Sequence, residues 1–240
     1  MRHLGLGQNP FVPIIITAWD STAAIVREIV NAGIDDFIMK PFSPKQLADR
    51  IQLLINARKP FVVTSDYIGP DRRNDKERAS TIKPIVVPNS LRDKNIFTFW
   101  DEQNFLQSIQ QTKELINSEK ARRTAAYASF LIKLIVEDLE QSRDLANILL
   151  NIGRLKTAVS ELTRRLTTDM HEILVQMIET LTRLSASITE DPTKISSKDI
   201  RLMPLLGMAI MKMTYPERDE IALAQDITSA VAGYRSRRNE

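Results

Sequence analysis

The stretch that decides the fold of the first part of the chain is Val12–Thr17, which reads Val-Pro-Ile-Ile-Ile-Thr. A short continuous apolar run rich in β-branched residues is typical of a parallel strand that is buried on both faces. A helix is predicted over residues 23–32, and Gly33 is suited to end it. A second strand is predicted over Asp36–Met39 and a second helix over residues 43–58. Residues 1–58 therefore predict alternating strands and helices with a parallel sheet.

The rest of the chain divides into two regions of different composition. Residues 59–98 contain the polar run Asn74–Arg78 and two prolines, Pro84 and Pro88, around a short apolar run. This composition predicts a linker that is extended in places and partly disordered. Residues 99–240 carry apolar residues at helical spacing, and the whole chain has only 7 glycines. We expect this last region to be wholly helical.

An apolar seam runs along the longest predicted helix. Its positions alternate steps of three and four residues, which places them on one face of a helix. The seam residues are Leu145, Ile148, Ile152, Leu155, Val159, Leu162 and Leu166. The pattern continues to Ile188, before Asp191, and predicts one long helix. Such a stripe must be covered either by a second copy in a parallel coiled coil or by other helices of the same chain. We predict a helical bundle that also self-associates through this seam, with the coiled-coil dimer as the alternative.

The composition excludes several classes of function. The chain has no cysteine, which excludes disulfides, zinc–thiolate sites and thiol catalysis. It has 2 histidines, so we do not expect a metal site, and no nucleophile–base pair or phosphate-cradling loop indicates an enzyme. The net charge is +3 and no helix-turn-helix pattern is evident, so we do not expect nucleic-acid binding. No apolar run reaches the roughly 18 residues needed to span a bilayer, and we predict a cytoplasmic protein.

Two short motifs follow the two predicted strands. Thr17-Ala18 comes after the first strand, and Lys40-Pro41-Phe42 comes after the second. The order of strands, helices and motifs resembles the fourth and fifth βα units of the receiver domain of bacterial two-component response regulators. The resemblance implies a flavodoxin-like fold, a doubly wound parallel sheet. The predicted fold is thus a partial receiver over residues 1–58, followed after the linker by an all-α helical bundle or coiled-coil region over residues 99–240.

The resemblance also implies roles for four residues. The hydroxyl of Thr17 would bind a phosphoryl oxygen after phosphorylation, and Lys40 would pair with the same phosphoryl group. Phe37 matches an aromatic residue that turns inward on activation, and the bond to Pro41 is a candidate cis peptide. Thr17 and Lys40 would lie at the carboxyl ends of adjacent parallel strands, where open α/β sheets bind ligands.

The chain departs from the receiver family in the residues that carry its chemistry. Receivers place an acidic pair after the first strand and a phosphoacceptor aspartate after the third, and neither is present here. We interpret Asp20 as a helix cap and Asp35 and Asp36 as solvated residues, not as substitutes. Residues 1–58 alone should therefore have no phosphorylation chemistry, and Mg²⁺ is expected only if the missing half is present. The Val12–Thr17 strand would expose an apolar edge, which favours a fragment or truncated gene product over a complete domain.

A third motif follows the receiver-like part. The sequence Tyr-Ile-Gly-Pro-Asp-Arg-Arg over Tyr67–Arg73 is similar to a short motif in linkers that follow receivers in some bacterial regulators. It supports the family resemblance without indicating a mechanism.

The sequence therefore predicts a response regulator of a two-component phosphorelay. A sensor histidine kinase or a phosphotransfer protein would supply the phosphoryl group, and the helical region would act as the output. The alternative is a non-catalytic helical scaffold with a relic receiver, and a DNA-binding regulator is a third reading. The input signal, the output partner and the oligomeric state are not encoded in any pattern that we recognise.

Overall fold

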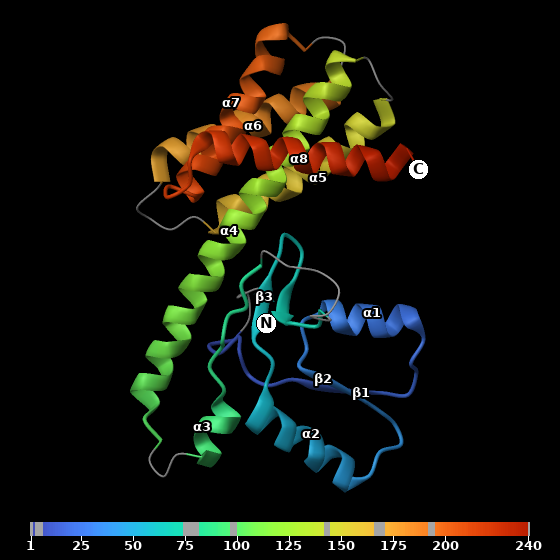
Figure 1. Ribbon diagram of the computed structural model, residues 1–240, viewed down its shortest axis with the longest axis vertical. Helices are drawn as coiled ribbons and strands as arrows, with labels where there is room; N and C mark the ends of the chain where they lie inside the picture. The colour runs from blue at the N-terminus through green and yellow to red at the C-terminus, as the bar shows by residue number, and fades with distance from the viewer. Residues whose placement is uncertain are drawn as a thin grey trace. The chain divides into compact units, whose positions relative to one another are not determined.

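The computed structural model describes residues 2, 7–73, 82–96, 100–141, 145–165, 171–191 and 195–239. Over these ranges the protein is mostly helical, with eight helices and two small two-stranded sheets (Figure 1). The chain forms two compact units, Met1–Asn117 and Ser118–Glu240, and the division falls within helix α4 (Glu102–Glu140). None of the described helices is long and apolar enough to cross a membrane.

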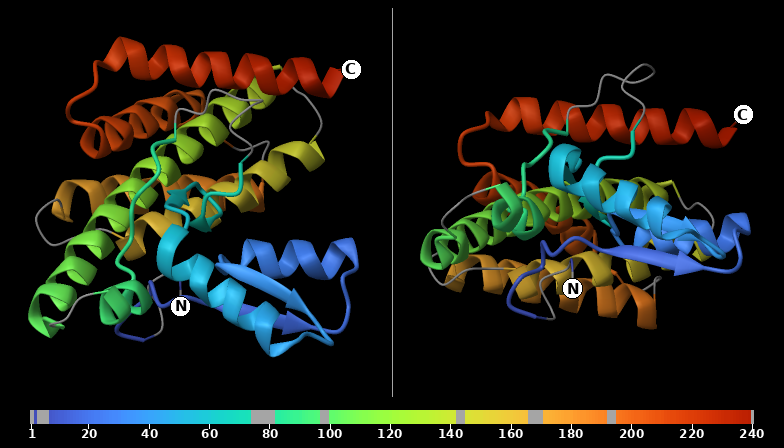
Figure 2. Two further views of the ribbon diagram at one scale, coloured as in Figure 1. Left: turned by 60° about the horizontal axis from the view of Figure 1, so that its bottom comes forward. Right: turned by 90° about the horizontal axis from the view of Figure 1, so that it is seen from below.

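The first unit begins with the predicted strand–helix–strand–helix order. Strands β1 (Ile15–Ala18) and β2 (Asp36–Met39) pair in parallel, from Ile15 opposite Asp36 to Ala18 opposite Met39. Helices α1 (Ala23–Asn31) and α2 (Pro44–Ala57) lie on opposite faces of this pair (Figure 2). The two predicted βα units are therefore present, whereas the larger flavodoxin-like sheet stays a prediction.

A reciprocal cap fixes the start of α2. The Ser43 hydroxyl accepts a hydrogen bond from the Gln46 backbone nitrogen at 3.2 Å, and the Gln46 side chain accepts one from the Ser43 nitrogen at 2.7 Å. Pro44 occupies the first helical position, where its missing N–H costs nothing. The cap begins α2 shortly after β2, so the segment Lys40–Phe42 lies at the carboxyl end of the strand pair.

The side of the strand pair formed by β1 and α1 is only partly buried. Within the described residues, β1 pairs with β2 alone, and none of the four β1 residues is fully buried. Helix α1 is amphipathic, yet none of its nine residues is buried, including Ile25 and Ile29 of its apolar face. The apolar strand edge expected from the sequence is thus present in the structure.

The segment predicted as a linker packs into a core instead. Strands β3 (Phe61–Val63) and β4 (Ile68–Pro70) pair antiparallel, and Phe61 exchanges two backbone hydrogen bonds of 2.7 Å with Ile85. This small sheet, helix α3 (Ser90–Ile96) and the first part of α4 belong to the first unit. Its buried cluster contains Phe11, Phe61, Val63, Ile68, Ile85, Val87, Ile109 and Ile116. The linker prediction over 59–98 therefore differs from the structure, because short apolar runs at both ends have partners elsewhere in the unit. The polar run Asn74–Arg78 lies outside the described residues.

The second unit is a helical bundle. It contains the second part of α4 together with α5 (Leu145–Arg165), α6 (His171–Glu190), α7 (Ser197–Thr214) and α8 (Glu220–Asn239). All five helices contribute side chains to one buried core. The helical bundle predicted from the sequence is thus observed, and its self-association stays a prediction.

The prediction of one long helix from Leu145 to Ile188 is wrong. Helix α5 ends at Arg165, α6 begins at His171, and the two helices pack against each other. Five seam residues are buried in the core of the same chain: Ile148, Ile152, Leu155, Val159 and Leu162. Leu145 is 48% exposed, and Leu166 lies outside the described residues. The five buried seam residues therefore do not form a surface for a second copy.

Candidate functional site

The carboxyl edge of the β1–β2 pair carries two of the predicted phosphoryl ligands. Thr17 lies opposite Ile38 in the strand register, and the Lys40 backbone nitrogen donates to the Ala18 carbonyl oxygen at 2.8 Å. Because the strands are parallel, their carboxyl ends meet at one edge, which is the usual ligand-binding edge of open α/β sheets. The structure thus brings Thr17 and Lys40 to the same edge. The peptide bond between Lys40 and Pro41 is cis.

The Lys40 ammonium makes a surface contact with Trp19. Its Nζ atom lies 5.5 Å from the centroid of the Trp19 ring, and Trp19 is 74% exposed. A cation–π contact at an exposed site contributes about 0.5–1 kcal/mol. Among the described residues no carboxylate pairs with Lys40. The arrangement leaves Lys40 available for an anion at this edge.

Phe37 lies on β2, directly before Ile38, the residue that pairs with Thr17. Phe37 pairs with Ile16 in the register and is half-buried, while the next residue, Ile38, is buried. Phe37 lines a hollow between β2 and α2, together with Met39, Pro41, Gln46, Asp49, Arg50 and Leu53. Phe37 therefore lies in the first half of β2, three residues before Lys40, and it lines the hollow beside α2.

This edge has no cluster of metal ligands in the structure. Within the described ranges, no group of three or more histidine, aspartate or glutamate residues is placed to hold a metal ion. Asp20 accepts a hydrogen bond from the Thr22 backbone nitrogen at 2.8 Å, just before α1. The edge therefore offers a cation and a hydroxyl group, while its one nearby carboxylate among the described residues, Asp20, accepts the Thr22 N–H.

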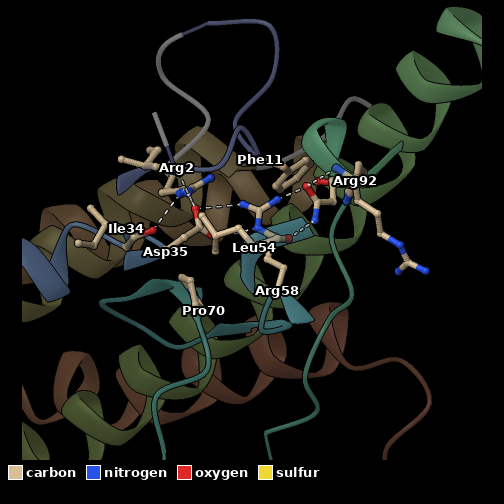
Figure 3. Close-up of polar contacts among 12 residues, drawn as sticks. Arg2, Phe11, Ile34, Asp35, Leu54, Arg58, Pro70 and Arg92 are labelled. Carbon is tan, nitrogen blue, oxygen red and sulfur yellow. Dashed lines mark hydrogen bonds and ion pairs between the residues drawn. The ribbon is translucent and has the colours of Figure 1, made fainter. Parts of the chain in front are cut away.

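Asp35 forms a buried ionic network that sequence reasoning missed (Figure 3). Its side chain is 1% exposed, and its Oδ2 atom lies 2.6 Å from Nη2 of Arg2. Arg58 approaches from the other side, with Nε 2.7 Å from Oδ1 and Nη2 3.2 Å from Oδ2. The Ile14 backbone nitrogen also donates to Oδ2 at 2.8 Å. The interpretation of Asp35 as solvated is wrong, because two arginines and a backbone N–H satisfy its carboxylate in the interior.

Both arginines have further partners in the first unit. Arg2 donates to the carbonyl oxygens of Gly33 at 2.9 Å and Pro10 at 2.6 Å, and Arg58 donates to that of Pro88 at 3.0 Å. Their guanidinium carbons lie 5.0 and 5.3 Å from the Phe61 ring centroid. Burial lowers the pKa of Arg2, and the Asp35 carboxylate opposes this shift. The network therefore ties β2, the end of α2 and the β3–β4 sheet together.

Asp36 differs from its neighbour Asp35. Its side chain is 19% exposed, and its Oδ2 atom lies 3.4 Å from Nη1 of Arg50, whose side chain is 50% exposed. An exposed pair of this kind contributes about 0–1 kcal/mol. The sequence interpretation of a solvated carboxylate thus suits Asp36 far better than Asp35.

The Tyr67–Arg73 motif packs onto the loop that precedes β2. Arg72 donates to the Ile34 carbonyl oxygen at 2.8 Å, and the Tyr67 hydroxyl donates to the Pro70 carbonyl oxygen at 3.0 Å. Burial raises the pKa of Tyr67. Within the motif, Arg73 pairs with Asp71 at 2.5 Å, and this hydrogen bond lowers the pKa of Asp71. The motif therefore has a structural role that the sequence alone did not indicate.

Two glycines allow this packing. A Cβ atom on Gly33 would lie 2.3 Å from the Ile68 carbonyl oxygen, and one on Gly69 would lie 2.7 Å from Cα of Gly33. Gly33 also has a φ angle of +78°, a conformation that side chains with a Cβ rarely adopt. The backbones of β4 and the loop before β2 thus meet where only glycine fits.

No protein-family model matches the chain, and comparisons with curated proteins and with solved structures give no significant match.

Proposed function

We propose that this chain is part of a bacterial two-component response regulator in the cytoplasm. Residues 1–58 would form the carboxyl-terminal part of its receiver, and the helical unit would be the output that the receiver regulates. The observation that carries the proposal is the shared edge, where Thr17 in the second half of β1 meets Lys40 just after β2, a cation that pairs with no carboxylate among the described residues. A hydroxyl and a cation are the groups that a phosphorylated aspartate requires.

The phosphoacceptor aspartate of this proposal lies outside the 240 residues. It would follow a strand that pairs with the free edge of β1, and Mg²⁺ would bind only with that segment. The edge of β1 that has no partner strand among the described residues supports this idea, and so does the apolar face of α1, of which no residue is buried. An apolar strand edge without a partner is a liability that proteins usually cover. A sensor histidine kinase or phosphotransfer protein would be the phosphoryl donor.

Phosphorylation would act through the face formed by α1, β2 and α2. Thr17 would move toward the phosphoryl group, Phe37 would follow, and the hollow that Phe37 lines beside α2 would change shape. Such a change gives a partner or the helical unit a different surface in each state.

The test begins with the intact mass of the protein isolated from its source cell. We expect a mass larger than that of 240 residues and hydroxylamine-sensitive phosphorylation by acetyl phosphate and Mg²⁺. Phosphorylation should slow hydrogen–deuterium exchange around residues 36–42, and Lys40→Ala should abolish that response. Lys45→Ala, an exposed lysine on α2, is the matched control and should respond normally. A native chain of 240 residues that takes no phosphoryl group, or a normal response in Lys40→Ala, would contradict the proposal.

A non-catalytic scaffold is the second candidate. It is favoured by contacts that hold the first unit together without any phosphoryl group, namely the Asp35 network and the hydrogen bond from Arg72 of the Tyr67–Arg73 motif to the Ile34 carbonyl oxygen. This function predicts that Lys40→Ala leaves every partner interaction unchanged. A DNA-binding regulator, the third reading of the sequence, has no specific support among the described features.

A further inference from the structure

A pocket lies within the helical unit, between α4, α7 and α8. Its volume is about 350 Å³, roughly twice the ~150 Å³ of an apolar cavity that holds benzene. The residues that line it include Ile132, Lys133 and Val136 on α4, Gly207 on α7, and Ala224 and Ile227 on α8. Small-molecule sites are typically concave and mainly apolar, with a few polar groups that orient the ligand. This pocket has that composition.

Small residues create the space. Ser129, Gly207 and Ala224, one from each of the three helices, line the pocket. A Cβ atom on Gly207 would already lie 3.0 Å from Cδ1 of Ile132. The Ser129 hydroxyl donates to the Gly207 carbonyl oxygen at 2.9 Å, so these buried polar atoms satisfy each other. The inner wall therefore offers apolar contact and no unpaired polar group of its own.

Two charged residues line the pocket, Lys133 and Glu137. The Lys133 Nζ atom donates to the Thr228 hydroxyl at 2.8 Å, and across the described residues no carboxylate pairs with this ammonium. Glu137, one turn further along α4, is paired with Arg235, whose Nε lies 3.1 Å from its Oε2. Arg235 also pairs with Asp138, with Nη2 2.8 Å from Oδ1, so the two carboxylates share this one guanidinium group. An ammonium group has three N–H donors, so Lys133 keeps two for a ligand.

We infer that this pocket binds a small amphipathic carboxylate, with its apolar body between Ile132, Val136 and Ile227 and its carboxylate on Lys133. The apolar wall accounts for the body, and the Lys133 ammonium, which pairs with no carboxylate among the described residues, accounts for the negative head. The site lies entirely in the helical unit and does not depend on the proposed phosphorelay function.

Calorimetric titration of the full chain with octanoate tests the inference, well below the concentration at which octanoate forms micelles. We expect one saturable site that also takes octan-1-ol more weakly and does not take octylamine. Lys133→Met should weaken octanoate binding about tenfold, because a charge-assisted hydrogen bond is lost, and should leave octan-1-ol binding unchanged. Equal binding of all three probes, or no effect of Lys133→Met on octanoate, would overturn the assignment of Lys133.

A pair of substitutions on α8 tests the location. Ala224 is exposed and lines the pocket, whereas Ala230 is exposed on the same helix and does not line it. Ala224→Leu should abolish octanoate binding, and Ala230→Leu should leave it intact, with both variants keeping the wild-type circular dichroism and melting temperature. No octanoate binding by the wild-type chain, or binding that survives Ala224→Leu, would overturn the site. Displacement of octanoate by vesicles of anionic phospholipid would assign the pocket to a membrane lipid and contradict the free-ligand proposal.

Discussion

Helices α1 and α5 have the same kind of pattern and different surroundings. Each has an apolar face, yet α1 has no buried residue among its nine, while α5 buries eight. The buried α5 residues are Ile148, Asn151, Ile152, Leu155, Ala158, Val159, Leu162 and Arg165. An amphipathic pattern indicates that a face needs a cover, and the rest of the fold decides whether the chain itself provides it. The bundle provides it for α5, and the two-stranded parallel sheet does not provide it for α1.

The largest effect is expected in the first unit, from Asp35→Ala. The substitution leaves two arginines, Arg2 and Arg58, buried without their carboxylate, and breaking a buried ion pair costs about 3–5 kcal/mol. Both tryptophans, Trp19 and Trp100, lie in the first unit, so urea unfolding followed by tryptophan fluorescence reports this unit. We expect the free energy of unfolding from this signal to fall by that amount.

Asp36→Ala is the matched control for Asp35→Ala. Its pair with Arg50 is half-exposed, so we expect a loss of about 0–1 kcal/mol in the same measurement. Equal losses for the two variants would mean that the ionic network around Asp35 does not stabilise the first unit. Burial of a charged group would then make no difference to stability in this unit.

The second effect concerns the helical unit. Leu155 is fully buried at the centre of α5, and Leu155→Ala should lower the free energy of unfolding by about 2–5 kcal/mol. Circular dichroism at 222 nm should follow the loss, because most helix lies in this unit. Leu150→Ala, on the same helix but 53% exposed, should change stability by no more than about 0.5 kcal/mol. A large effect of Leu150→Ala would show that the outer face of α5 is also covered.

The smallest effect is expected on α1. Ile29 belongs to its apolar face and is only half-buried, so Ile29→Ala should cost about 1 kcal/mol or less. The measurement is urea unfolding by tryptophan fluorescence at two protein concentrations tenfold apart. A cost as large as that of Leu155→Ala, growing with protein concentration, would show that a second copy covers this face and would remove the contrast between α1 and α5.

Local patterns were sufficient to predict the helices and strands of residues 1–58. The β-branched run before Thr17 predicted β1, and Ser43 with Pro44 predicted the start of α2, because both signals lie within a few neighbouring residues. The Asp35 network gave no such signal. Its partners Arg2 and Arg58 are separated from Asp35 by 33 and 23 positions in the chain, and only the fold brings them together.

The periodic pattern of the helical region predicted helix but not its ends. The spacing of three and four residues is the same in α5 and α6, so the seam does not distinguish one long helix from two that pack together. In the segment 59–98 the sequence underestimated the structure, because it predicted a linker where the chain forms strands that pack into a core. Its apolar runs, Phe61–Val63 and Ile85–Val87, are too short to indicate a strand with certainty, and their burial depends on Phe11 and Ile116 far away in the chain.

The order of synthesis gives the cluster around Phe61 a further consequence. Ile109 and Ile116 of α4 belong to this cluster, together with Phe11 from near the start of the chain. A ribosome makes the chain from its N-terminus, so the cluster that Phe11 joins cannot be complete when residue 58 emerges. It stays incomplete until Ile116 has left the exit tunnel, and during that interval Phe11 and the apolar residues of β3 and β4 are accessible to chaperones.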